Sequence, residues 1–136
     1  MRLSAVAAVS LALAALPACS STTSMPDVRT ATAALRQCFV SIAPLEVPGK
    51  AKVLAPCAEK DGPALIAALE KGEPTPPQVD CHADALAGAR RAVGAMQDLL
   101  KIYRRNTDTG TRAVAAARNV DQGLTLLESA VADCTK

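Results

Sequence analysis

The sequence predicts an all-α fold, a small disulfide-stapled helical bundle built on a long antiparallel helix hairpin. Three observations support this class. Apolar residues recur at steps of three and four along most of the chain, as they do on one face of an α-helix. Two of these lines, within 81–102 and 113–134, flank a turn sequence, Asn106-Thr107-Asp108-Thr109-Gly110. Four cysteines lie on the expected helices, close to where the hairpins would close.

The two lines of the long hairpin complement each other in size. Antiparallel pairing places Gly88 opposite Leu127 and Ala92 opposite Leu124, so that large side chains meet small ones and the helices can approach without voids. The same register places Cys81 opposite Cys134, which predicts a disulfide there. The first line is Cys81, Ala85, Gly88, Ala92, Ala95, Leu99 and Ile102, and the second is Ala113, Ala117, Val120, Leu124, Leu127, Val131 and Cys134.

A second apolar stripe runs beside the first line on the helix that begins near Cys81. It cannot face the same partner helix, so it needs another cover. We expect the helices of the N-terminal half to supply this cover; left open, the stripe would be a docking site for a partner protein. Its members are His82, Leu86, Ala89, Val93, Met96, Leu100 and Tyr103.

The N-terminal half begins with a helix that starts near Ser24, Pro26 and Asp27 and stops at Pro44. Its expected buried face is Val28, Ala31, Leu35, Cys38 and Ile42.

Val47-Pro48-Gly49 then predicts a turn, and Cys38 and Cys57 lie about equally far from it, so that a second hairpin could close on this pair. Pro56 must lie in the first turn of the helix that contains Cys57, or interrupt that helix. A short helix is expected from Asp61 to Lys71, with Leu65, Ile66 and Leu69 facing inward, before a proline-rich linker at 73–77.

The disulfide pattern follows from these two turns. Four cysteines allow three pairings, and the sequence does not exclude any of them. The positions of the turns favour Cys38 with Cys57 and Cys81 with Cys134. Such links matter here because the chain has one Phe, one Tyr and no Trp, so its core is built from small side chains.

The N-terminus carries an export signal. A basic residue, Arg2, precedes a short apolar run that ends at Leu16, which is typical of a signal peptide over residues 1–18. The sequence Leu16-Pro17-Ala18-Cys19 resembles the lipobox of bacterial lipoprotein precursors, apart from Pro17, where that family more often has a small or β-branched residue. The resemblance implies that Cys19 becomes the lipidated N-terminus, carrying fatty acyl chains such as palmitate. With Ser20 next, it also implies sorting to the outer membrane.

Cysteine parity supports lipidation. The chain has five cysteines, and acylation of Cys19 leaves an even set for pairing in an oxidising compartment. The alternative is ordinary cleavage after Ala18, which leaves a free thiol on a periplasmic or secreted protein. The expected organisation is therefore a signal peptide at 1–18, a flexible tether at 19–26 and one helical bundle domain at 27–136.

Candidate catalytic and metal sites are few. His82 is the only histidine, and Gln78 stands where a Cys-x-x-Cys-His haem motif would need a cysteine. A non-covalent haem or metal site using His82 is a distant alternative. A zinc site would need several ligands, and no nucleophile setting accompanies the histidine. We expect no enzyme activity, no catalytic or metal-binding residues and no cofactor.

Basic residues gather near the turn of the long hairpin. They predict contact with an anionic partner, either lipid headgroups, a glycan or an acidic protein face. The competing explanation is helix stability, because cations in the last turn of a helix are favoured by its dipole. Nucleic acid is not expected, because no aromatic stacking platform accompanies the charges. The candidate residues are Lys101, Arg104, Arg105, Arg112 and Arg118.

These features predict a small envelope lipoprotein with a binding or scaffolding role in the periplasm, held at the outer membrane by its lipid and contacting another envelope protein or component. Removal of Arg2 with the signal leaves 14 basic against 13 acidic residues, so net charge selects no partner. The alternative function is a periplasmic inhibitor or immunity-type protein against a cell-envelope toxin.

Overall fold

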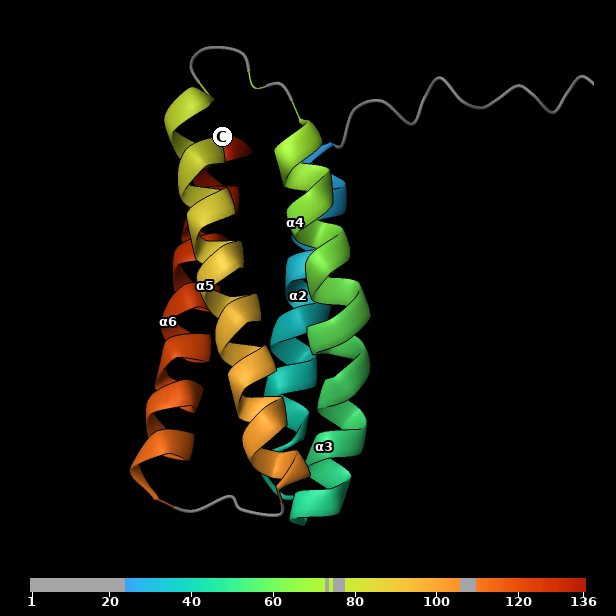
Figure 1. The fold of residues 1–136 in the computed structure, drawn as a ribbon. Coiled ribbons are helices and arrows are strands. Elements are labelled where there is room, and N and C mark those ends of the chain that lie inside the picture. Colours follow the sequence, from blue (N-terminus) through green and yellow to red (C-terminus); the bar gives the residue numbers. More distant parts are fainter. Residues whose placement is uncertain (1–23, 73, 75–77, 106–109) are drawn as a thin grey trace, which may run out of the picture.

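The described part of the chain folds into a bundle of four helical rods. The computed structural model describes residues 24–72, 74, 78–105 and 110–136. Within these residues the elements are α2 (Met25–Ser41), α3 (Val47–Pro56), a π-helix (Cys57–Asp61), α4 (Gly62–Lys71), α5 (Val79–Arg104) and α6 (Thr111–Cys134). α3, the π-helix and α4 follow one another without a break and form one rod (Figure 1). The predicted all-α, disulfide-stapled bundle is confirmed.

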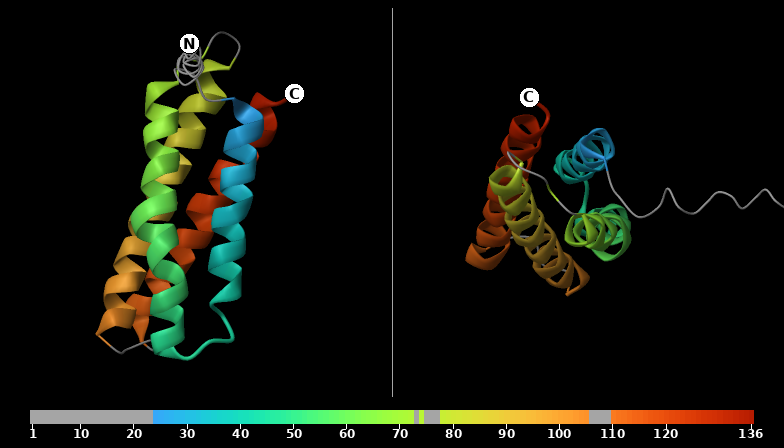
Figure 2. Two further views of the ribbon diagram at one scale, coloured as in Figure 1. Left: turned by 90° about the vertical axis from the view of Figure 1, so that its right-hand side faces the viewer. Right: turned by 90° about the horizontal axis from the view of Figure 1, so that it is seen from above.

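The long hairpin of α5 and α6 is the larger half of the bundle, and α2 with the α3–α4 rod forms the other half. Viewed along its axis, the bundle shows these two pairs side by side (Figure 2). The predicted signal peptide and most of the predicted tether lie outside the described residues, as do four residues of the predicted hairpin turn, 106–109. α2 begins within the predicted tether, at Met25, because Ser24 accepts a hydrogen bond from the backbone N–H of Asp27 and caps the helix.

α5 and α6 approach almost backbone to backbone. A Cβ atom built on Gly88 would lie 2.6 Å from the backbone nitrogen of Leu127, which agrees with the predicted register. A Cβ atom on Gly123 would lie 2.5 Å from the backbone nitrogen of Ala92. The predicted line on α6 did not include Gly123. Two glycines, one on each helix, therefore set the distance between α5 and α6.

The predicted line on α6 is also wrong at Ala117. Ala117 is half-buried, and its neighbour Ala116 is buried in its place. The line follows a strict period of 3.5 residues, whereas a straight α-helix has about 3.6 residues per turn and drifts by roughly 20° per heptad. Near the start of α6 this drift moves the contact face by one residue.

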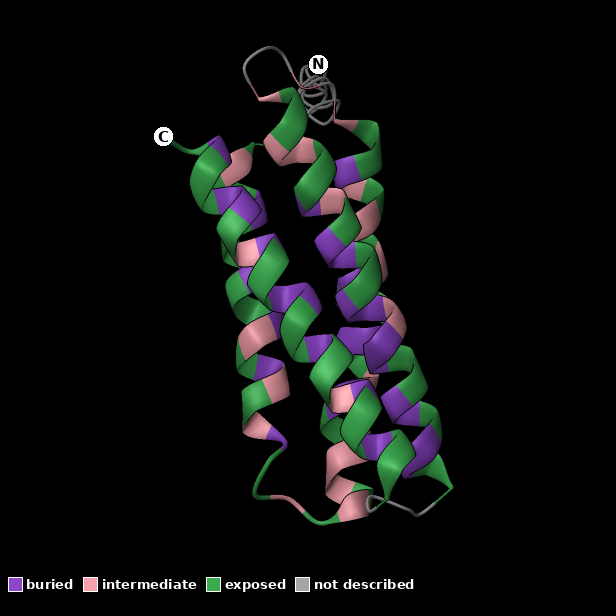
Figure 3. Ribbon diagram, turned by 90° about the vertical axis from the view of Figure 1, so that its left-hand side faces the viewer, coloured by how far each residue is buried: buried purple, intermediate pink, exposed green. Residues whose placement is uncertain are grey.

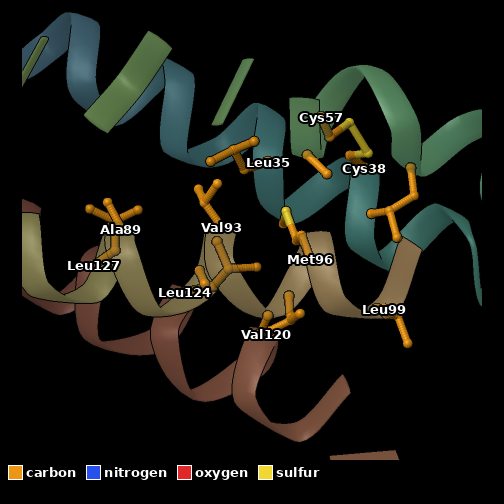
Figure 4. Packing of buried hydrophobic residues seen from close by; sticks show 14 of the residues in the cluster. Leu35, Cys38, Cys57, Ala89, Val93, Met96, Leu99, Val120, Leu124 and Leu127 are labelled. Carbon is orange, nitrogen blue, oxygen red and sulfur yellow. A yellow bond between two sulfur atoms is a disulfide. The ribbon is translucent and has the colours of Figure 1, made fainter. Parts of the chain in front are cut away.

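The second stripe of α5 is covered, as expected, by the N-terminal helices. Met96 and Val93 are fully buried and lie beside Leu35 of α2 and the Cys38–Cys57 disulfide (Figure 4). The burial pattern in Figure 3 shows the buried positions facing the interior along each helix. The alternative that this stripe is an open docking face is therefore wrong. Its buried members are Ala89, Val93, Met96, Leu100 and Tyr103.

Val47-Pro48-Gly49 does not form the predicted turn. These residues are the first turn of α3, and the chain reverses earlier, between Ile42 and Glu46, where the backbone N–H of Leu45 donates to the carbonyl of Ile42. Proline suits the first turn of a helix because its missing N–H is not needed there. The Val-Pro-Gly sequence is thus a helix start.

Pro56 is the last residue of α3, inside a rod that continues past it without a break, so it neither lies in a first turn nor interrupts the helix that contains Cys57, as the sequence had led us to expect. The rod continues past it as a π-helix, in which each carbonyl accepts from the N–H five residues on. For Ala58 that residue is Pro63, which has no N–H. The side-chain amide of Gln97 on α5 donates to the Ala58 carbonyl instead, at 3.1 Å. A residue of another helix therefore satisfies the carbonyl that the proline leaves free.

Two disulfides join the predicted pairs, although the chain reversal between Cys38 and Cys57 lies earlier than the turn that was expected there. Cys38–Cys57 links α2 to the π-helix, and Cys81–Cys134 closes the open end of the long hairpin. Ion pairs add links between the rods, among them Arg36 of α2 with Asp121 and Glu128 of α6 at 2.7 and 2.9 Å. The two carboxylates raise the pKa of Arg36 above its ordinary value.

The disulfides should contribute unequally to stability. Chain-entropy arguments predict about 4 kcal/mol for the Cys81–Cys134 link and about 3 kcal/mol for Cys38–Cys57, because the longer loop loses more freedom in the unfolded chain. We expect C81S/C134S to lower the melting temperature more than C38S/C57S, and a reducing agent to lower it most. A melting curve that reducing agent leaves unchanged would contradict this account.

The close approach of α5 and α6 at Gly88 and Gly123 leads to a second prediction. Gly88→Ala and Gly123→Ala should each destabilise the protein by about 1–3 kcal/mol, because the added methyl group meets backbone atoms that cannot move aside. Gly94→Ala is the matched control: nothing lies within 4 Å of its Cβ position, and alanine there should stabilise α5 by about 0.5–1 kcal/mol. Urea unfolding measures all three, and equal stability of the three variants would overturn the proposed contact.

Candidate functional site

A groove lined by several charged side chains lies at the tip of the long hairpin. It has a volume of about 500 Å³ and receives side chains from the end of α5 and the beginning of α6. We call it the basic groove. Its lining consists of Asp98, Lys101, Ile102, Arg105, Arg112, Ala115, Ala116 and Asn119.

Three of the five predicted basic residues meet in this groove. Lys101 and Arg105 come from the last turn of α5 and its C-cap, and Arg112 from the first turn of α6. All three are exposed. Within the part of the chain that the structure describes, none of them forms a hydrogen bond or ion pair through its side chain. Their charges are therefore available to a ligand.

Arg104 does not belong to the groove. Its guanidinium donates to both carboxylate oxygens of Glu59 on the π-helix, at 2.9 and 3.0 Å. This pair lowers the pKa of Glu59 and raises the pKa of Arg104. Arg104 thus links α5 to the α3–α4 rod. Arg118 is exposed on α6, away from the groove lining.

Helix stability explains only part of this cluster. Lys101 and Arg104 lie at the C-terminal end of α5, where a helix dipole favours cations. Arg112 lies in the first turn of α6, where the dipole disfavours a cation. That turn contains no acidic residue, and its N-cap, Gly110, has no side chain to cap the helix. The dipole therefore accounts for Lys101 but not for Arg112.

Sequence reasoning missed Asn119 as a part of this site. Asn119 follows Arg112 by seven residues, two helical turns, which places both on one face of α6. Its side-chain oxygen accepts a hydrogen bond from Arg91 of α5 at 3.2 Å. Its two amide N–H groups can donate hydrogen bonds to a ligand in the groove. The seven-residue spacing is the signal that could have identified it.

His82 lies at the opposite end of the bundle. It contributes to a cavity of about 490 Å³ between the start of α2, the end of α4 and the C-terminus. Met25 lines the same cavity, whereas Met96 is buried in the core. All four cysteines of the described chain are in disulfides, so none offers a thiolate. Among the described residues no group of three or more His, Cys, Asp or Glu side chains converges on a point.

Two further searches bear on function. None of the described helices combines the length and the apolar content needed to cross a bilayer. Comparison of the chain with protein-family models, curated proteins and solved structures finds no significant match.

The ion pair between Arg104 and Glu59, which separates Arg104 from the basic groove, can be tested by its pH dependence. The pKa of Glu59 is lowered in the folded protein and takes its ordinary value in the unfolded chain. The pair therefore stabilises the fold above that ordinary pKa, and its contribution is lost as the pH falls through the lowered value. Because both groups are exposed, the contribution is small.

We expect carboxyl NMR titration to show a lower midpoint for Glu59 in the native protein than in Arg104→Gln. The midpoints of Arg112→Gln and the native protein should agree, since Arg112 lies on α6 and is not among the residues that surround Glu59. If Arg104→Gln leaves the Glu59 midpoint in place, the ion pair does not form in solution.

Proposed function

We propose that the protein is a small lipid-anchored envelope protein that uses its helical bundle to hold a binding site in the periplasm. Lipidation of Cys19 would fix the N-terminus to the outer membrane. The lipobox-like sequence and the even set of the remaining cysteines support this anchor. The two disulfides support an oxidising compartment, since disulfides persist there and are rare in the cytosol.

One observation carries the binding role. The basic groove lies at the end of the bundle opposite the start of α2 (Figure 1). α5 has 26 residues and joins these two ends, so the groove stands about 39 Å from the end at which the anchor would enter. The rod would hold three cations, for which the described residues show no ion pair, away from the anchoring membrane. This is the arrangement expected of a module that reaches a partner deeper in the envelope.

The charges in the groove favour a binding role over a purely structural one. Arg112 does not stabilise α6, because a cation at the start of a helix is disfavoured by the helix dipole. The ion pairs that do link the rods use other residues, such as Arg90 with Glu70 at 2.7 Å. Three cations and one carboxylate gathered at one tip are typical of a surface that meets an anionic partner.

Replacement of Cys19 tests the proposed anchor. We expect the native protein in the outer-membrane fraction, with a mature N-terminus at Cys19 that carries acyl chains. Cys19→Ser should appear in the soluble periplasm with the same circular dichroism spectrum and both disulfides, because the substitution leaves the bundle unchanged.

Mass spectrometry of the purified native chain is the second measurement. A thiol at Cys19 without lipid, or a retained signal peptide, would refute the anchor. The variant K101Q/R105Q/R112Q is the control, and it should remain in the outer-membrane fraction because its charges play no part in processing.

A further inference from the structure

We propose that the basic groove binds a short peptide that carries several free carboxylates and one amine, the chemistry of the stem peptides in the bacterial cell wall. The inference rests on the proposed function for its compartment and orientation. The class of ligand comes from the size of the groove, its donors and its one carboxylate.

The size of the groove indicates a small ligand. A volume of about 500 Å³ lies within the usual range of small-molecule sites, roughly 300–1,000 Å³. Protein interfaces depend on aromatic anchors in a well-packed apolar centre. The lining here has no aromatic side chain, and its apolar members are Ile102 and two alanines. It suits a polar ligand of a few residues better than the face of a folded protein.

The donors indicate carboxylates. Arg105 and Arg112 can each bind a carboxylate through two parallel N–H donors, and Lys101 adds a third positive charge. Asn119 contributes amide N–H groups, and its oxygen accepts from Arg91. These groups all donate, so they select a ligand rich in acceptor oxygens, such as a peptide with free carboxylates and backbone carbonyls.

Asp98 restricts the chemical class of the ligand further. Its exposed carboxylate lines the same groove, one turn before Lys101 and Ile102. It repels a compact dianion such as phosphate and attracts an ammonium group. A ligand with both a net negative charge and an amine satisfies all of these side chains. Anionic lipid headgroups of the anchoring leaflet are disfavoured, because the groove lies at the far end of the rod from the anchor.

The test is co-sedimentation of the complete mature chain, as its Cys19→Ser form, with purified cell-wall sacculi and with phosphatidylglycerol vesicles. We expect sacculi to retain the protein and vesicles to leave it in solution. K101Q/R105Q/R112Q should weaken binding to sacculi by about tenfold or more, since charge-assisted hydrogen bonds are lost. The control R29Q/K71Q/K136Q removes the same charge at the opposite end and should bind as the parent does.

Soluble probes test the role of Asp98. Asp98→Asn should weaken binding of a disaccharide-tripeptide released from sacculi and strengthen binding of inorganic phosphate, both measured by calorimetry. Equal losses in the two triple variants would show binding by net charge alone and overturn the proposal. Sedimentation with vesicles but not with sacculi, or with neither, would overturn it as well. Each of these results leaves the fractionation test of the Cys19 anchor unaffected, so the two proposals can fail separately.

Discussion

The close approach of α5 and α6 is the contact on which the rest of the structure depends. Gly88 and Gly123 bring the two backbones together where any larger residue would collide with main-chain atoms. Because one face of α5 packs against α6, the second apolar stripe of α5 faces the helices of the N-terminal half. The hairpin is thus both one half of the bundle and the surface on which the other half assembles.

The N-terminal half meets that surface with a rod that proline distorts. Gly62 lies against Val93 of α5, where a Cβ atom would come within 2.7 Å of the valine side chain. The neighbouring Pro63 leaves the Ala58 carbonyl without its helical donor, and Gln97 of α5 supplies the replacement. The π-helical distortion and the close packing of Gly62 against α5 therefore occur at the same place. α5 supplies the hydrogen bond that the distortion leaves unmade. π-helical turns of this kind are tolerated where the surrounding structure supports them.

The distribution of charge along the hairpin connects the fold to the proposed function. α5 begins with Asp80 and Asp84 and ends with Lys101 and Arg104, so charge changes sign along one helix. α2 starts at the end of the bundle where α5 begins, and the residues that line the basic groove belong to the other end, where α5 ends and α6 begins (Figure 1). A chain with nearly balanced total charge can therefore still present a concentrated positive site, because the bundle separates its charges along its axis.

The sequence by itself determined the fold class, the register of the long hairpin and the favoured disulfide pairs, because each of these follows from the spacing of apolar residues and turns along the chain. It also located the basic cluster. Tertiary structure alone decided that Pro48 lies in the first turn of a helix and that Ala116 is buried in place of Ala117. It also decided that Arg104 pairs with Glu59, whereas Arg105 and Arg112 pair with none of the described residues. Spacing along one helix fixes which residues share a face. Which of these residues contacts another helix depends on the angle at which the helices cross and on the side chains of the neighbouring helix.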